Sequence, residues 1–161
     1  MPSPRRETLR TVAAQIAALD ELIGLAKRSI RVFDIDLSGM GWNDAARTAT
    51  IARFLRANRN ASLRIIVHDT RWIESSCPRL TQLLRTYGHV FTIYRSGPDA
   101  SGAMDPFAIV DERHFLHRFH AEQPNAEFAV EAPHAASPFV ERFEEIWAHG
   151  EPGVSAAVLG L

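Results

Sequence analysis

Residues 104–120 bring together side chains that could do chemistry. The stretch reads MDPFAIVDERHFLHRFH, so Asp111 is followed by His114, His117 and His120 at three-residue intervals. A carboxylate with nearby imidazoles could transfer protons or bind a metal ion. Side chains alternate along a strand, however, so His114 and His120 would face one way and His117 the other. We therefore expect hydrogen-bonded histidines on a hairpin, with no metal site and no cofactor.

A second set of polar residues lies at the ends of the apolar stretches IRVFDIDL, LRIIVHD and VFTIYR. In open α/β sheets, ligands bind outside the carboxyl ends of the strands, so these residues could converge on one rim and form a pocket. The alternative is that Asp69 is a turn or capping residue and that Arg71 pairs with a nearby carboxylate. The members of this set are Asp34, Asp36, His68, Asp69, Arg71 and Arg95.

The spacing of apolar residues predicts the elements that hold these groups. Three- and four-residue steps indicate a helix within residues 7–30, and β-branched runs indicate buried strands. Strands that alternate with helices imply parallel pairing, and a later hairpin turns at residues 111–113. We predict an α/β fold with a mixed, largely parallel sheet flanked by helices. Further helices are expected at 44–58, 78–88 and 137–150, and strands at 29–37, 62–69, 89–95, within 107–119 and at 126–132.

The ends of two helices carry recognisable signals. Asn43 or Asp44 could cap the helix at 44–58. Ser137 is expected to cap the last helix, with Pro138 at its first position and Gly150 just after its end. Residues 1–150 would then form a single domain, followed by a C-terminal tail at residues 151–161.

Composition narrows the class of protein. The chain has 161 residues with 46% hydrophobic and 23% charged side chains, which suits one globular domain. A formal net charge of −1 argues against a nucleic-acid-binding protein. The single Cys77 fits a reducing compartment, and no apolar run approaches the roughly 20 residues of a membrane span. We expect a cytoplasmic protein without membrane association, and the Ala- and Arg-rich composition is typical of bacteria with GC-rich genomes.

The order of elements resembles one half of the phospholipase D-like fold. The resemblance begins at ALDELIGLAKRSIRVFDIDL and covers roughly residues 9–149. More narrowly, the chain is similar to an uncharacterised phospholipase D-like domain found C-terminal to GNAT-type acetyltransferase domains in some proteobacterial proteins. The stretches that carry this closer likeness are LRIIVHDTRW, RLTQLLRTYGHVFTIYR, FAIVDERHFLHR and FVERFEEIWAHGEP.

The resemblance implies a motif of the form H-x-K-x-x-x-x-D, in which His attacks a phosphodiester or protonates the leaving group and Lys neutralises the phosphate. Asp111 matches the motif Asp, but Pro106 stands at the Lys position and Met104 at the His position. A thioether can neither carry a phosphoryl group nor shuttle a proton, and proline has no charge. The Gly-Ser and Asn that follow the motif in the enzymes are absent from residues 118–121. The resemblance therefore predicts the fold and argues against the activity.

Three functions follow from this comparison, of which the third, nucleic-acid binding as in some phospholipase D-like proteins, is weakened by the absence of a basic surplus. The first is a non-catalytic binding or interaction module, which is the interpretation we prefer. The second is a phosphodiesterase or other phosphate-processing enzyme with a relocated site, in which His68 or His117 is the acid/base and Arg71 or Arg118 holds an anion. The phospholipase D-like topology would bring His117 and Arg118 to the same rim. It also implies a homodimer, because such halves usually pair, and family analogy suggests an acetyltransferase partner.

Overall fold

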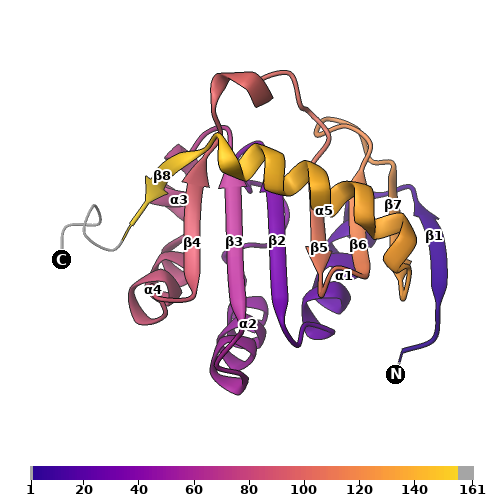
Figure 1. The fold of residues 1–161 in the computed structure, drawn as a ribbon, viewed down its shortest axis with the longest axis horizontal. Coiled ribbons are helices and arrows are strands. Elements are labelled where there is room, and N and C mark those ends of the chain that lie inside the picture. Colours follow the sequence, from indigo (N-terminus) through magenta and orange to yellow (C-terminus); the bar gives the residue numbers. More distant parts are fainter. Residues whose placement is uncertain (1, 156–161) are drawn as a thin grey trace.

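An eight-stranded mixed sheet forms the centre of the computed structural model, which describes residues 2–155 (Figure 1). The strands lie in the order β1-β7-β6-β5-β2-β3-β4-β8. Their bounds are β1 Arg5–Leu9, β2 Ser29–Asp34, β3 Ser62–Val67, β4 Phe91–Arg95, β5 Phe107–Val110, β6 His114–Arg118, β7 Ala126–Val130 and β8 Glu151–Val154. The helices are α1 Val12–Gly24, α2 Ala45–Ala57, α3 Arg71–Ser76, α4 Pro78–Thr86 and α5 Pro133–Ala148, with a 3₁₀ turn at Pro98–Ala100.

The pairing of the strands brings several of their ends to one edge of the sheet. β2, β3 and β4 are parallel, whereas β5, β6, β7 and β1 follow on the other side of β2 in antiparallel pairs. β2, β3, β4 and β6 therefore all end at the same edge, which we call the carboxyl edge. The opposite edge, where β2 and β3 begin and the β5–β6 hairpin turns, is called the amino edge (Figure 1).

Helices cover both faces of this sheet. α5 crosses one face, and α1, α2 and α4 lie on the other (Figure 1). Successive residues of β2 accordingly belong to two separate cores, with Val32 packed toward α1 and α2 and Phe33 toward α5. The continuous apolar runs of the central strands are explained by this double coverage. The predicted mixed α/β fold flanked by helices is confirmed. Within residues 2–155, no helix is both long and apolar enough to cross a membrane.

The predictions at both ends of the chain were wrong. Residues 5–9, expected to lie partly in a helix, form the edge strand β1 against β7, and α1 begins only after Thr11, which caps it by accepting from the amide of Ala14. Four of the five β1 residues are exposed, so no apolar alternation marked this strand. Residues 151–154, expected in a tail, form β8 against β4. The rest of that predicted tail, residues 156–161, lies outside the described residues.

Other boundaries also differ from those predicted. α5 begins at Pro133, so Pro138 lies inside the helix and Ser137 does not cap it. β2 stops at Asp34 rather than continuing to residue 37, and Leu37 itself has a positive φ of 72° that a strand does not permit. The short helix α3 was not predicted. Of the two cap candidates for α2, Asp44 is the cap, and it accepts from the amide of Arg47 at 3.3 Å.

Candidate functional site at the carboxyl edge

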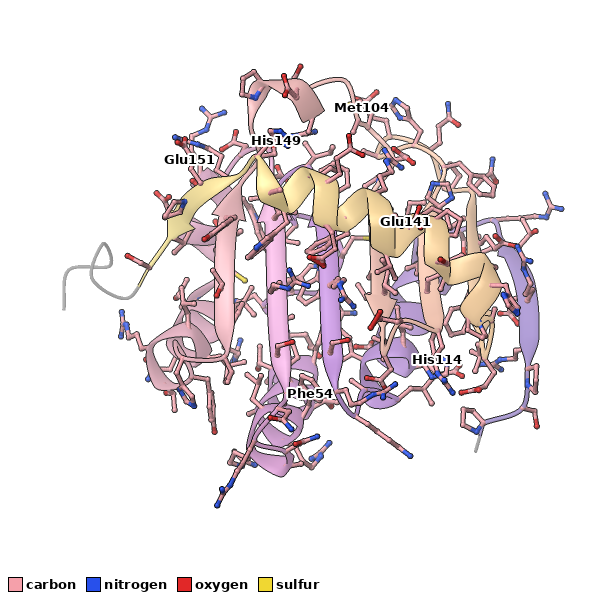
Figure 2. The ribbon with its side chains drawn as sticks, viewed as in Figure 1. Phe54, Met104, His114, Glu141, His149 and Glu151 are labelled. Carbon is pink, nitrogen blue, oxygen red and sulfur yellow. The ribbon has the colours of Figure 1, made fainter. Side chains whose placement is uncertain are left out.

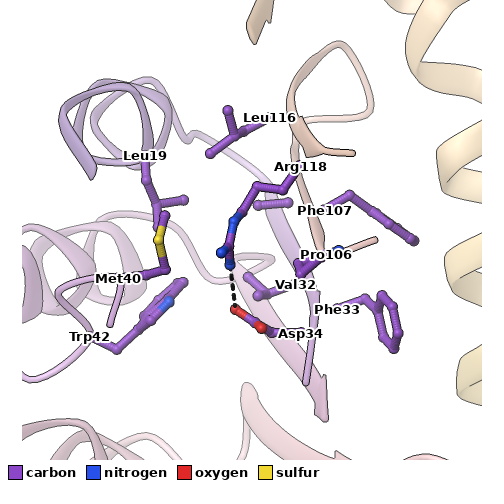
Figure 3. A pocket seen from close by; sticks show the side chains of 11 residues that line it. Leu19, Val32, Phe33, Asp34, Met40, Trp42, Pro106, Phe107, Leu116 and Arg118 are labelled. Carbon is purple, nitrogen blue, oxygen red and sulfur yellow. Dashed lines mark ion pairs between the residues drawn. The ribbon is translucent and has the colours of Figure 1, made fainter. Parts of the chain in front are cut away.

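A small pocket opens at the carboxyl edge, on the face of the sheet covered by α1 (Figure 3). The cavity itself has a volume of only about 20 Å³, far below the roughly 300–1,000 Å³ of small-molecule sites. Most of the lining is apolar, and the two charged residues among it are Asp34 from β2 and Arg118 from β6. The lining residues are Leu19, Val32, Phe33, Asp34, Met40, Trp42, Pro106, Phe107, Ala108, Leu116 and Arg118.

Asp34 and Arg118 form a loose ion pair inside this pocket. Nη1 of Arg118 lies 3.8 Å from Oδ2 of Asp34, and their side chains are only 11% and 9% exposed. Arg118 also donates from Nη2 to the carbonyl of Ala121 at 3.0 Å, whereas its buried Nε has no hydrogen-bond partner among residues 2–155. Oδ1 of Asp34 accepts from the amide of Ile35 at 2.6 Å. Burial raises the pKa of Asp34 to about 6, although the charge of Arg118 opposes this shift.

Arg47 holds the wall of the pocket that Met40 and Trp42 form. This arginine of α2 is buried and donates from Nε to Asp20 at 2.8 Å and from Nη1 to the carbonyl of Met40. Its guanidinium lies over the ring of Trp42, 5.2 Å from the ring centroid. Gly41 has a φ of 82°, and a Cβ there would lie 3.2 Å from the guanidinium. Sequence reasoning missed Arg47, because nothing in a helical arginine indicates that it is buried.

The three positions that the resemblance assigned to the motif, Met104, Pro106 and Asp111, divide between the two edges of the sheet. Pro106 lines the pocket, and its carbonyl accepts from the amide of Arg118 at 2.8 Å. The carbonyl of Met104 similarly accepts from the amide of Ala121 at 2.8 Å. Because residues opposite one another in an antiparallel pair share a face, Arg118 stands beside the position where the motif requires lysine. Sequence reasoning named Arg118 as a candidate but did not reveal this relation.

Asp111 follows the last residue of β5, Val110, which pairs with His114, so it lies at the amino edge. Met104 and His114 lie at opposite edges of the sheet (Figure 2). Its buried carboxylate accepts from three successive backbone amides in the turn before β2. The shortest contacts are 3.0 Å from Lys27, 2.7 Å from Arg28 and 3.0 Å from Ser29. Asp111 itself has a φ of 54°. Through these contacts Asp111 links the β5–β6 hairpin turn to the turn before β2 and to the first residue of β2.

His68 has both ring nitrogens engaged. Nε2 lies 2.7 Å from the carbonyl of Ala103, which can only accept, so Nε2 carries the proton. Nδ1 lies 2.5 Å from Oγ of Ser96, within hydrogen-bond distance of that hydroxyl. The ring also meets Phe33 edge-on, on the α5 side of the sheet. His68 is thus held by contacts on both ring nitrogens and does not line the pocket.

His117 faces α5 rather than the pocket. Its Nε2 lies 2.8 Å from Oδ2 of Asp105, and its ring packs on Phe139 of α5. Arg142 of α5 binds the same carboxylate through both of its terminal nitrogens, at 2.6 and 2.5 Å. Burial opposes ionisation of Asp105, but the hydrogen bonds from Arg142 and His117 outweigh it and lower the pKa of Asp105. Sequence reasoning did not identify Asp105 or Arg142.

The remaining rim residues have local partners. Asp69 binds Arg71 through both carboxylate oxygens, which lowers the pKa of Asp69 to about 2. Arg95 pairs with Glu151 at 2.5 Å, and Asp36 accepts from the amide and hydroxyl of the residue two positions later. Of the predicted rim set, the structure therefore brings Arg118 to the pocket together with Asp34, and it turns the others toward neighbours of their own.

The remaining histidines and the cysteine lie away from the pocket. Nδ1 of His114 accepts from the amide of Glu131 at 2.9 Å, and Nδ1 of His120 accepts from the amide of Glu122 at 3.1 Å. His120 follows β6 rather than lying on it. Burial raises the pKa of the Cys77 thiol to about 11, which does not suit a nucleophile.

Solved structures share this fold at low sequence identity. TrmBL2, described as an archaeal chromatin protein with a novel mode of DNA binding, superimposes with a TM-score of 0.70 and 13% identity. That match covers 95% of this chain but 55% of TrmBL2, so the chain spans about half of that protein. Nuc from Salmonella typhimurium, a phospholipase D family member, gives a TM-score of 0.63 and 16% identity over 95% of this chain and 100% of Nuc. Phosphatidylserine synthase from Haemophilus influenzae gives 0.63 and 12%, over 99% of this chain and 42% of the synthase.

Sequence comparison identifies the family. Curated protein sequences give no match. Residues 11–156, which include every element from α1 to β8, match the family described as "Domain of unknown function (DUF7931)". The chain belongs to that family, and its fold is the one seen in phospholipase D-like proteins such as Nuc.

Proposed function

We propose that this chain is a non-catalytic phospholipase D-like module that binds rather than cleaves. The observation that carries the proposal is the chemistry of the pocket beside the degenerate motif. Pro106 lines it in place of a lysine, and Met104 precedes it in place of a histidine. The one cation there, Arg118, faces the carboxylate of Asp34 at 3.8 Å. A phosphate entering this pocket would meet the carboxylate of Asp34, and among the described residues that line the pocket there is neither a histidine nor a lysine.

The test is turnover by the purified chain. We expect no hydrolysis of bis(p-nitrophenyl) phosphate, phosphatidylcholine or plasmid DNA above the buffer rate. His117→Asn and Arg118→Gln serve as diagnostic variants, and circular dichroism confirms that each has folded. Hydrolysis by the wild type that either variant abolishes would overturn the proposal. A rate that both variants retain points to a contaminating enzyme and leaves the chain without its own activity.

An enzyme with a relocated site is the second candidate, but the contacts favour it less. His68 has both ring nitrogens bonded, and Arg71 is bound by Asp69. His117 is the better candidate, because its contact with Asp105 could orient the ring for proton transfer. It faces α5, however, whereas Arg118, the next residue, faces the pocket. The His117→Asn variant above therefore also tests this candidate.

A homodimer and an acetyltransferase partner belong to the same proposal. Phospholipase D-like halves usually pair, and the exposed Phe119, 47% accessible, lies just after β6 near the pocket. Light scattering on the purified chain should give twice the monomer mass, and a monomer mass at every concentration would remove the dimer. Copurification with an acetyltransferase in the native cell would support that partner. A cytoplasmic location fits the buried, unpaired thiol of Cys77.

A further inference from the structure

Basic side chains gather at the amino edge, opposite the pocket. We call the set Lys27, Arg28, Arg56, Arg59 and Arg113 the basic edge. Lys27 and Arg28 lie in the turn between α1 and β2, Arg56 and Arg59 at the end of α2 and just beyond it, and Arg113 in the β5–β6 hairpin.

Backbone contacts hold these turns together. The side-chain amide of Asn58 donates to the carbonyl of Lys27 at 3.2 Å, and the amide of Ser62 donates to the carbonyl of Arg28 at 3.1 Å. A surface hollow of about 650 Å³ is lined by Lys27, Arg28 and Arg113. Its lining also includes the carboxylates of Asp111 and Glu131. The basic edge is therefore a built surface of adjoining turns rather than a set of scattered cations.

Most of these charges have no carboxylate partner. Within residues 2–155, the side chains of Lys27, Arg28 and Arg59 make no ion pair or hydrogen bond, and Arg56 contacts only the hydroxyl of Tyr87. Arg113 alone is paired, with Glu131 at 3.3 Å. At the carboxyl edge, by contrast, Arg71, Arg95, Arg118 and Arg142 each face a carboxylate. The net charge of −1 therefore conceals an uneven distribution.

The carboxylates and helix ends at the amino edge do not cancel this charge. Asp111 contributes a formal negative charge even though three backbone amides bind its carboxylate. Glu131 is paired with Arg113, and Glu112 lies 3.9 Å from Arg31. α1, α2 and α4 end here, and each helix end contributes about half a negative charge. Asp111 and these helix ends together offset about two and a half of the four positive charges that lack a carboxylate partner. A positive surplus remains, and it is carried mostly by arginine, the side chain best suited to phosphate.

We propose that the basic edge binds the phosphate backbone of a nucleic acid without reading its sequence. Phosphate contacts from exposed arginine and lysine fix position but carry no sequence information. An anionic membrane is the less suitable partner, because stable membrane binding also needs apolar anchors. The large apolar side chains that are exposed within residues 2–155 are Val12 and Phe119, at the start of α1 and after β6, both at the other edge. The proposal does not depend on whether the pocket is catalytic.

Fluorescence anisotropy with labelled oligonucleotides tests this proposal. Single-stranded DNA, duplex DNA and duplex RNA carry the same phosphate group, so comparing their affinities identifies which kind of nucleic acid the basic edge binds. The variant K27Q/R28Q/R59Q removes three unpaired positive charges from the basic edge. The control variant R6Q/R10Q/R79Q also removes three positive charges, but from β1, the residue after β1 and α4. We expect the first variant to bind duplex about tenfold more weakly at low salt, and its slope of log K against log salt to be shallower by about 2.7. The second variant should bind like the wild type.

Several results would overturn the proposal. These are no binding of the wild type at low salt, a wild-type salt slope near zero, or equal losses in the two triple variants. Binding to phosphatidylglycerol vesicles, but to no oligonucleotide, through the same three residues would assign the surface to membranes instead. Because the wild-type salt slope is measured without any substitution, the proposal stays testable even if a variant does not fold.

Discussion

Asp111→Asn should lower the free energy of unfolding by about 3 kcal/mol, measured by urea denaturation. The carboxylate accepts from the amides of Lys27, Arg28 and Ser29, and Asp111 is 7% exposed. Each hydrogen bond to a charged acceptor is worth about 1.5–3 kcal/mol, and a buried amide left without its acceptor incurs a further penalty. Asparagine keeps one acceptor oxygen and tolerates the φ of 54°, so the variant measures the lost acceptor rather than backbone strain.

Glu112→Gln is the matched control for that experiment. Glu112 is the next residue and also has a positive φ, of 59°. Its side chain is 58% exposed and lies 3.9 Å from Arg31, so its substitution should cost less than about 0.5 kcal/mol. Equal urea midpoints for Asp111→Asn and the wild type would contradict the prediction, because they would show that water satisfies the three amides as well as the carboxylate does.

The structural role of Asp111 changes what its substitution can reveal about activity. In H-x-K-x-x-x-x-D, the Asp would be a natural residue to substitute in a search for residual catalysis. Here its carboxylate lies at the amino edge and the pocket at the carboxyl edge, so an inactive Asp111 variant would report unfolding. Substitution of Arg118 or His117, which lie near the motif positions Met104 and Pro106, separates chemistry from folding.

The centre of the fold could be predicted because burial leaves a periodic record in the sequence. β2, β3 and β4 are apolar on both faces, and α1 and α2 have apolar stripes. The edges leave no such record. β1 is mostly exposed, and β8 contains Pro152, which lacks a ladder donor; both strands exist because the neighbouring strand offers free backbone groups.

The site could be predicted only in outline, because strand ends follow from sequence but side-chain partners do not. Asp34 and Asp36 were equivalent candidates, and Asp34 is the one that lines the pocket because β2 stops there. The adjacent residues His117 and Arg118 point to opposite faces of β6, so they do not share one site at the rim as had been expected. The net charge of the whole chain could not indicate the basic edge, because a total does not show where the charged residues lie in the fold.

Asp34 should make the stability of this protein depend on pH in the direction opposite to its other perturbed carboxylates. Its pKa is raised from 3.8 to about 6, so the folded state binds its proton more tightly than the unfolded state does. The stability that protonated Asp34 contributes is therefore fully present below about pH 4 and is lost as the pH rises through about 6. Asp69, Asp105 and Glu144 have lowered pKa values, so their contributions are present at neutral pH and lost on acidification.

Comparison with Asp34→Asn isolates this contribution, because the other carboxylates are common to both proteins and cancel. The unfolding free energy of the wild type minus that of the variant should fall by about 2–3 kcal/mol between about pH 4 and about pH 7. The variant also leaves Arg118 without its carboxylate, but arginine does not titrate in this range, so that loss is a constant offset. A difference that is flat, or that rises with pH, would show that Asp34 is ionised in the pocket throughout.

Arg118→Gln tests the cause of the shift. The charge of Arg118 lowers the pKa of Asp34 and so opposes the larger effect of burial. The same comparison is made between the Arg118→Gln variant and the double variant that also carries Asp34→Asn. The difference between their unfolding free energies should fall at higher pH, and by a larger amount, than in the presence of the arginine. If burial is the main cause of the raised pKa, the fall persists without the arginine. If the fall disappears, Asp34 is solvated once the arginine is gone, and the Arg118 side chain is what keeps water from its carboxyl group.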